Sequence, residues 1–112
     1  MAAQGFQAIV VLITVPSSEV GSKIARALVE ERQAACVNLV PEITSTYRWE
    51  GQVQVAPESL LIVKTGRALY AALADRVRTL HPYTVPEIIA LPLAAGSEPY
   101  LQWIADSTAT SG

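Results

Sequence analysis

The sequence predicts one α+β domain in which helices cover one face of a β-sheet. Three observations lead to this class. An apolar run rich in Ile and Val opens the chain, two amphipathic segments show helical spacing, and the turn signal Glu50-Gly51 divides a long β-rich segment. Because these segments alternate as strand, helix, two strands, helix and strand, we expect a single βαββαβ unit over residues 1–112, followed by a short helix.

The first strand and the first helix are expected within residues 5–35. The run GFQAIVVLITVP, which ends at Pro16, is apolar along its length and predicts a strand buried on both faces. In the next segment, SSEVGSKIARALVEERQAA, Ser17 or Ser18 can cap a helix. Its apolar residues recur at helical spacing: Val20, Ile24, Ala27 and Leu28. This pattern predicts an amphipathic helix that covers the sheet.

A long hairpin is expected over residues 36–65, because two β-rich runs flank Glu50-Gly51. Its arms are long for a small domain. Pro41 and Pro57 lie within the arms and require bulges or edge positions, since proline cannot donate to a β-ladder. Such arms overreach their own sheet and expose strand edges, which predicts pairing with other copies of the chain.

The second half of the chain completes the unit with a helix, a strand and a terminal helix. The apolar stripe of the second helix is Leu69, Leu73, Val77 and Leu80, and Pro82 stops its continuation. VPEIIALPL predicts a short strand. GSEPYLQWIADS predicts a terminal helix that Ser97 caps and that Tyr100 and Trp103 dock. TATSG, at the end of the chain, predicts a frayed tail. Two helices on one face of a mixed four-stranded sheet form the ferredoxin-like pattern, which hosts many functions.

Composition limits the kind of protein and its partners. The chain is 51% hydrophobic, which is more than a domain this short can bury well alone, so we expect a symmetric oligomer. The net charge of −2 is spread without a basic stripe, which argues against nucleic acid as a partner. The apolar run at residues 8–13 is too short to cross a membrane and lacks the flanks of a signal peptide. A single cysteine, Cys36, excludes an intrachain disulfide and predicts a cytoplasmic protein.

Several motifs, taken together and in order, resemble one family. ERQAACVNLVPEITSTYRWEGQV, LLIVKT, HPYTVPEII and YLQWI follow one another as they do in the CutA family of divalent-cation tolerance proteins, and the match covers nearly the whole chain. The resemblance implies a ferredoxin-like protomer in a tight homotrimer whose long hairpins pair between subunits. It also implies a link to copper tolerance and divalent-metal binding. The family trimer resembles PII-type signalling proteins, which bind effectors in clefts between subunits.

Two positions depart from the family pattern. Thr14 stands at the end of the first strand, where some members carry a cysteine proposed as a copper ligand. Thr84 stands where many relatives have glutamate or glutamine, which removes one carboxylate near His81. With few soft donors left, we expect any metal site to be weak, open to water or built from more than one chain.

The candidate metal ligands are His81, Glu87, Glu58 and Cys36, and copper(II) is the expected metal. His81 offers an imidazole, but it could instead be a polar residue that satisfies the end of the second helix. Glu87 at a strand margin needs a partner or a site. Glu58 aligns with an acidic residue in relatives, or it is a solvated charge. Cys36 could be a soft ligand or a small buried hydrophobe.

The candidate residues of a ligand cleft between subunits are Tyr47, Trp49, Lys64 and Tyr83. The aromatic residues could equally pack across the subunit interface. Lys64, the only charge in LLIVKT, could instead form a buried ion pair with Glu87 at a subunit boundary, where it would fix register and assembly. We therefore expect a non-enzymatic, cytoplasmic homotrimer that binds divalent metal, copper first, and acts in cation tolerance. The alternatives are a PII-like small-molecule sensor and a structural adaptor trimer.

Overall fold

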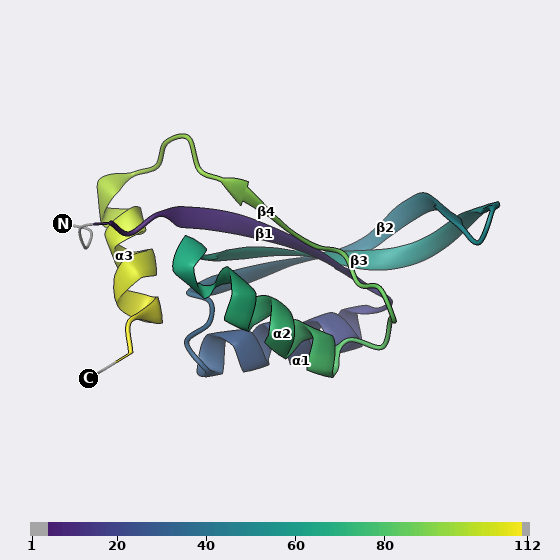
Figure 1. Ribbon diagram of the computed structural model, residues 1–112, viewed down its shortest axis with the longest axis horizontal. Coiled ribbons are helices and arrows are strands. Elements are labelled where there is room, and N and C mark those ends of the chain that lie inside the picture. The colour runs from purple at the N-terminus through teal and green to yellow at the C-terminus, as the bar shows by residue number, and fades with distance from the viewer. Residues whose placement is uncertain (1–4, 111–112) are drawn as a thin grey trace.

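A four-stranded sheet with two helices packed on one face forms the body of the protein, as seen in a computed structural model that describes residues 5–110 (Figure 1). In chain order the elements are β1 (Ala8–Val15), α1 (Ser18–Glu30), β2 (Cys36–Trp49), β3 (Gln52–Gly66), a 3₁₀ turn η1 (Arg67–Leu69), α2 (Tyr70–Leu80), β4 (Ile88–Pro92) and α3 (Glu98–Thr108). This order confirms the predicted βαββαβ unit with an additional C-terminal helix.

The sheet has the strand order β2-β3-β1-β4, and all three neighbouring pairs are antiparallel. The prediction of a mixed sheet is therefore wrong. The crossover through α1 does make β1 and β2 parallel, but β3 lies between them and is antiparallel to both. No strand among the described residues consequently has a parallel neighbour.

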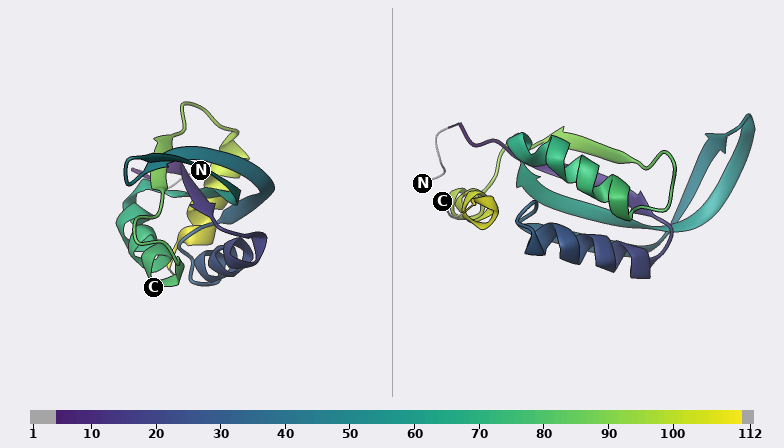
Figure 2. Two further views of the ribbon diagram at one scale, coloured as in Figure 1. Left: turned by 90° about the vertical axis from the view of Figure 1, so that its right-hand side faces the viewer. Right: turned by 60° about the horizontal axis from the view of Figure 1, so that its bottom comes forward.

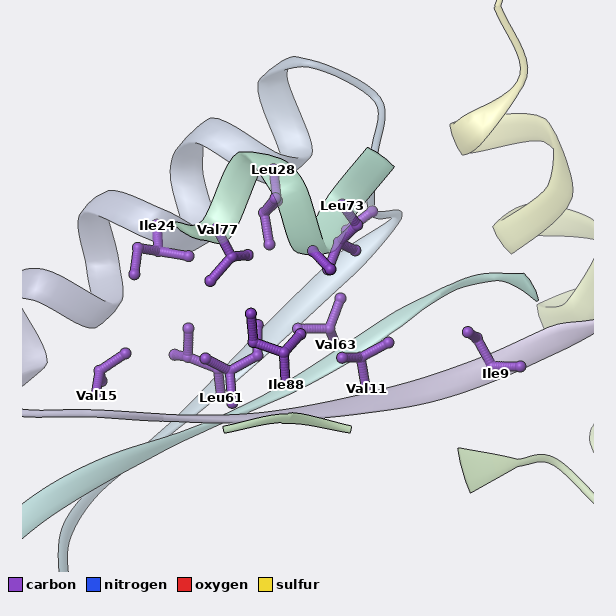
Figure 3. Packing of buried hydrophobic residues seen from close by; sticks show 13 residues of the cluster. Ile9, Val11, Val15, Ile24, Leu28, Leu61, Val63, Leu73, Val77 and Ile88 are labelled. Carbon is purple, nitrogen blue, oxygen red and sulfur yellow. The ribbon is translucent and has the colours of Figure 1, made fainter. Parts of the chain in front are cut away.

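The hydrophobic core lies between the sheet and the two helices. Alternate residues of β1 are buried toward this side, and Figure 3 shows the sheet side chains pointing at Ile24 and Leu28 of α1 and at Leu73 and Val77 of α2. The buried sheet residues of this cluster are Ile9, Val11, Ile13, Val15, Leu61, Val63 and Ile88. The predicted amphipathic stripes of both helices are thereby confirmed in their central residues.

The opposite face of the sheet has no helix on it. The intervening residues of β1 are only partly buried. In a single chain β1 is therefore buried on one face, and the prediction of burial on both faces is wrong there. Ile89 and Leu91 of β4 are about half exposed on this face, beside Leu12 and Val10. The chain has 7015 Å² of accessible surface, whereas a monomer of 12.0 kDa is expected to have about 6000 Å². A single chain therefore leaves an apolar surface uncovered.

The hairpin of β2 and β3 projects beyond the rest of the sheet (Figures 1 and 2). Its turn is the predicted Glu50-Gly51, and both residues have positive φ (50° and 78°), as a two-residue hairpin turn requires. Pairing of β1 with β3 ends at Val15 and Ser59, so the outer part of β3 has only β2 as a neighbour. Pro57 lies in this outer part, which confirms its predicted edge position.

The second proline of the hairpin, Pro41, lies in a β-bulge. The register between β2 and β3 shifts between Val40 and Ile43, and Glu42 has a φ of 58°. The predicted bulge is confirmed. Its physical effect is to increase the local twist of the strand pair where the hairpin leaves the sheet.

The helix ends confirm some predicted caps and correct others. Ser17, not Ser18, caps α1, because its hydroxyl accepts a hydrogen bond from the amide of Val20. Ser97 precedes α3, but its side chain makes no capping hydrogen bond. Ser17 therefore contributes a capping bond at α1 that Ser97 does not contribute at α3.

The terminal helix α3 packs at the end of the sheet opposite the hairpin (Figure 1). Its buried residues are Ile104, Ala105 and Thr108, whereas Tyr100 and Trp103 are 42% and 44% exposed, with their ring centroids 5.4 Å apart. Tyr100 and Trp103 were expected to dock this helix; Tyr100 does reach Cys36 of β2, but the buried face of the helix lies on the other residues. Thr108 is helical and its hydroxyl donates to the carbonyl of Ile104, so the prediction of a frayed tail is wrong for Thr108, and residues 111–112 lie outside the described residues.

Candidate functional site

A cavity of about 620 Å³ lies where β1 ends and the hairpin continues. It is lined by Thr14 at the end of β1, by the hairpin, and by the 82–87 segment between α2 and β4. The hairpin residues in the lining are Ser45, Thr46, Tyr47, Trp49 and Glu58, and those of the segment are Pro82, Tyr83, Thr84, Val85 and Glu87. This volume lies within the usual range of small-molecule sites.

His81 fixes the segment that closes one side of this cavity. It follows the last residue of α2 and is only 7% exposed. Its Nε2 lies 2.7 Å from the carbonyl oxygen of Thr14, and its Nδ1 accepts a hydrogen bond of 3.1 Å from the amide of Tyr83. Because Nδ1 is an acceptor, the ring is neutral and Nε2 carries the proton that is donated to Thr14. His81 thus ties the end of α2 to the end of β1.

This geometry bears on the prediction of His81 as a metal ligand. A metal-binding imidazole needs one ring nitrogen with a free lone pair. In the described structure Nδ1 is directed at the amide of Tyr83 and Nε2 at the carbonyl of Thr14. The geometry therefore favours the alternative reading, in which His81 is a polar residue that satisfies a turn.

Glu58 is the most buried carboxylate of the cavity lining. It is 8% exposed, and its Oε2 accepts a hydrogen bond of 2.7 Å from the hydroxyl of Tyr83. Within residues 5–110, no lysine, arginine or histidine forms an ion pair with it. A buried carboxylate is costly unless a positive group or several donors compensate it. Glu58 therefore lies at the cavity with a single hydrogen bond and without a cationic partner among the described residues.

Tyr83 covers Glu58 from the 82–87 segment. The pKa of its hydroxyl is raised to about 12, chiefly by burial, then by the hydrogen bond and the charge of Glu58, with a smaller effect from Tyr47. The hydroxyl therefore remains protonated at neutral pH and acts as a donor. Its ring also packs on that of His81, with 4.7 Å between the centroids. One residue thus contacts both the turn and the cavity carboxylate.

Glu87 lines the same cavity but is exposed. The ion pair predicted between Glu87 and Lys64 is absent from the described residues. Glu87 directly precedes Ile88, which pairs with Ile13 of β1, whereas Lys64 pairs with Val10. The two side chains are therefore separated by about 13 Å along the strand direction. The register of the sheet rules out the pair within one chain.

Cys36 and Lys64 lie together but away from the cavity. They pair across β2 and β3, toward the end of the sheet that carries α3. Cys36 is partly exposed, not fully buried. Burial raises the pKa of Tyr100, and the neighbouring Cys36 thiol raises it further. The structure therefore separates Cys36 from the other predicted ligands and Lys64 from the predicted cleft residues.

The described residues contain no group of three or more His, Cys, Asp or Glu side chains arranged to hold a metal ion. Of the four predicted ligands, only Glu58 and Glu87 line one cavity. These two carboxylates suit a cation with a preference for oxygen, but they do not fill a coordination sphere. The described residues of one chain therefore do not form a complete metal site.

Sequence reasoning missed two hydroxyl residues of the cavity, Ser45 and Thr46. A signal for Ser45 was available, because Ser45, Tyr47 and Trp49 alternate along β2 and such residues share one face of a strand. Thr46 has no such signal, since strict alternation would point it away. The twist of the hairpin beyond the bulge brings it into the lining.

The antiparallel βαββαβ sandwich, with a hairpin that overruns its sheet and a cavity at the hairpin base, defines a ferredoxin-like α+β domain. Within that class the family is clear. Residues 9–107 match the family model described as CutA1 divalent ion tolerance protein. The chain belongs to this family, which confirms the resemblance seen in its motifs.

Named relatives and solved structures agree with this assignment. The Divalent-cation tolerance protein CutA of Thermus thermophilus is 60% identical over 99 residues, which are 88% of this chain and 96% of that relative. Human Protein CutA is 51% identical over 96 residues, which are 86% of this chain and 54% of that relative. The crystal structure of CutA1 from Oryza sativa has a TM-score of 0.90 at 48% identity and covers 94% of this chain and 96% of that chain. The chain spans about half the length of the Arabidopsis thaliana and human relatives.

The names of the relatives describe tolerance of divalent cations and no catalysed reaction. They do not fix one compartment, because an Arabidopsis thaliana relative is named chloroplastic and an Archaeoglobus fulgidus relative is named periplasmic. Each of the helices described between residues 5 and 110 is too short or too polar to cross a membrane.

Proposed function

We propose that this protein is a non-enzymatic cation-binding protein of the divalent-cation tolerance response, with Glu58 and Glu87 as its cation ligands. The observation that supports this most directly is Glu58, a carboxylate that is 8% exposed, faces a cavity and has no cationic partner among the described residues. A bound cation would compensate that charge. Copper(II) is the expected ion, because among divalent first-row metals it binds a given oxygen or nitrogen site most tightly.

The proposed working form is a cytoplasmic homotrimer. Two features of the single chain support assembly: the apolar face of the sheet has no cover, and the hairpin extends past β1 with one edge unpaired. The incomplete ligand set supports it as well, since a neighbouring chain or water must supply the remaining donors. The free Cys36 and the lack of any disulfide among the described residues are compatible with a reducing compartment.

A second candidate function is that of a PII-like trimeric sensor for a small molecule. The cavity volume of about 620 Å³ favours it, because a bare metal ion does not require so much space. Tyr47, Trp49 and Tyr83 form the aromatic part of the lining. Lys64, predicted for the same cleft, lies elsewhere in the chain and could reach a cavity only from another subunit.

Native mass spectrometry of metal-stripped protein, with and without copper(II), tests the proposal. We expect the mass of a trimer and a fixed number of coppers per trimer. Glu58→Gln removes the charge but keeps the shape, so it should weaken copper binding by at least tenfold. Glu98→Gln is the matched control, because Glu98 lies in the first turn of α3, away from the cavity. Equal copper uptake by Glu58→Gln and the unmodified protein would exclude this site, and a monomer mass would exclude the assembly.

A further inference from the structure

We infer that the cavity at the hairpin base binds an organic cation, recognised by its alkylammonium group, through the aromatic residues Tyr47, Trp49 and Tyr83 and the carboxylates Glu58 and Glu87. The inference rests on the proposed function in one respect, namely that Glu58 faces a cation. It goes beyond that function in assigning a class of ligand other than a metal ion.

The aromatic residues approach the cavity from two separate elements. Tyr47 and Trp49 are two residues apart on β2 and therefore lie on one face of the strand, while Tyr83 comes from the segment after α2. Within residues 5–110 the aromatic packing pairs are His81 with Tyr83 and Tyr100 with Trp103. Neither Tyr47 nor Trp49 belongs to such a pair, and the two residues are 43% and 48% exposed. Ring faces left open around a cavity attract an alkylammonium group through their quadrupoles.

The charges of the lining select the sign of the ligand. Among the lining residues that the structure describes, Glu58 and Glu87 are the only ionic side chains, and none is lysine, arginine or histidine. An anionic ligand would meet two carboxylates without a counter-charge. An ammonium ligand would instead compensate Glu58, whose only hydrogen bond from the described residues is the one to Oε2 from Tyr83. Cationic recognition is therefore favoured over anionic recognition.

The size of the cavity suits an organic ligand. A metal ion with six waters occupies roughly 200 Å³, taking about 30 Å³ for each water. The cavity has about 620 Å³. The cavity is thus larger than a hydrated metal ion requires and has room for the organic part of a ligand beyond its alkylammonium group. Aromatic walls also offer a metal ion no donor atoms, whereas they suit an alkylated nitrogen.

Fluorescence of Trp49 gives a direct test. The chain has two tryptophans, and Trp103 lies on α3, so the full-length Trp103→Phe protein reports on the cavity alone. This protein is titrated with tetramethylammonium chloride, with tert-butanol as a neutral molecule of similar shape, and with sodium chloride at equal ionic strength. We expect a saturable change with tetramethylammonium only. Tyr47→Leu should weaken binding by about tenfold, in line with the loss of one desolvated cation–π contact.

Variants inside and outside the cavity show which residues bind which cation. Tyr100→Leu removes an aromatic residue outside the cavity and should leave binding unchanged. Glu58→Gln should weaken both tetramethylammonium and copper(II), whereas Tyr47→Leu should weaken tetramethylammonium alone. Urea unfolding of each variant is measured first. A cooperative unfolding transition shows that the variant is folded, so that a loss of binding cannot be explained by a loss of structure.

The results can separate this inference from the proposed function. Copper bound at fixed stoichiometry without any saturable response to tetramethylammonium would overturn the organic-cation inference and leave the proposed function standing. An equal response to tert-butanol would overturn it too, because the cavity would then recognise shape and not charge. Tetramethylammonium bound without copper would support the inference and remove copper from the proposal. Binding of neither would refute both.

Discussion

Replacing His81 by alanine should destabilise the protein by roughly 2–3 kcal/mol. The side chain is 7% exposed and bonds two backbone groups, the carbonyl of Thr14 at 2.7 Å and the amide of Tyr83 at 3.1 Å. A buried polar group left without a partner costs about 1–3 kcal/mol. Water can reach Tyr83, which is 38% exposed, so the low end of that range applies to its amide. This loss would be a large part of the free energy of unfolding, which is roughly 5–15 kcal/mol for most proteins.

Urea unfolding followed by tryptophan fluorescence measures this change, at one fixed protein concentration so that any assembly contributes equally. Two further variants divide the effect between the two bonds. His81→Asn places an acceptor near the position of Nδ1 and can retain the bond from Tyr83, while His81→Gln places a donor near Nε2 and can retain the bond to Thr14. Each should recover part of the loss. Thr84→Ala, an exposed position in the same segment, should change stability by less than about 0.5 kcal/mol.

One result would refute this reasoning about His81. If His81→Ala unfolds at the same urea concentration as the unmodified protein and loses copper uptake, then His81 is a metal ligand and its backbone bonds contribute little. Loss of stability with copper uptake retained would support the role in the turn. The two measurements together therefore decide between a structural residue and a ligand.

Two further outcomes follow from other parts of the structure. Spectrophotometric titration should give Tyr83 a pKa of about 12, and Glu58→Gln should lower that pKa only in part, because burial is the larger cause. Folding raises this pKa from 10.0. The protonated Tyr83 hydroxyl therefore contributes to the free energy of unfolding below pH 10, and this contribution is lost as the pH rises toward 12. Gly21→Ala should lower the melting temperature by a few degrees, because a Cβ would lie 2.9 Å from Leu39 and 3.1 Å from Val15. Overpacking costs about 1–3 kcal/mol, more than the gain of up to about 1 kcal/mol in helix propensity, and an unchanged or raised melting temperature would contradict this.

Local signals predicted the elements well because each has a short-range cause. Glu50-Gly51 supplies the positive φ values that a tight hairpin turn needs, and both residues adopt them. Pro41 required a bulge and lies in one. The stripe of the second helix was readable because Leu73 and Val77 face the sheet at helical spacing. In each case the sequence within a few residues determines the backbone.

Relationships between distant residues were harder to predict. Within one chain, an ion pair of Lys64 with Glu87 would require a register that places them side by side, but the pairing of β3 and β4 with β1 places them about four residues apart. The bond between Glu58 and Tyr83 joins residues 25 positions apart through the segment after α2, and no local pattern specifies it. Predicted ligands could be chosen by residue type, but their separation depends on strand register, which residue type does not encode.

The cavity and the projecting hairpin have one common cause. β1 ends at Val15, next to Pro16, which has no amide proton to donate to a ladder, while β3 continues in the direction of the turn. From Glu58 outward, β3 has therefore lost its neighbour on the β1 side, and the space beside that free edge is where the cavity lies. A second chain that pairs along this edge would also line the cavity. Ligand binding and assembly would then share residues, and by linkage each must change the affinity of the other by the same factor. Measuring assembly with and without tetramethylammonium or copper is therefore a test of the site, because a ligand held within one chain alone would leave the assembly constant unchanged.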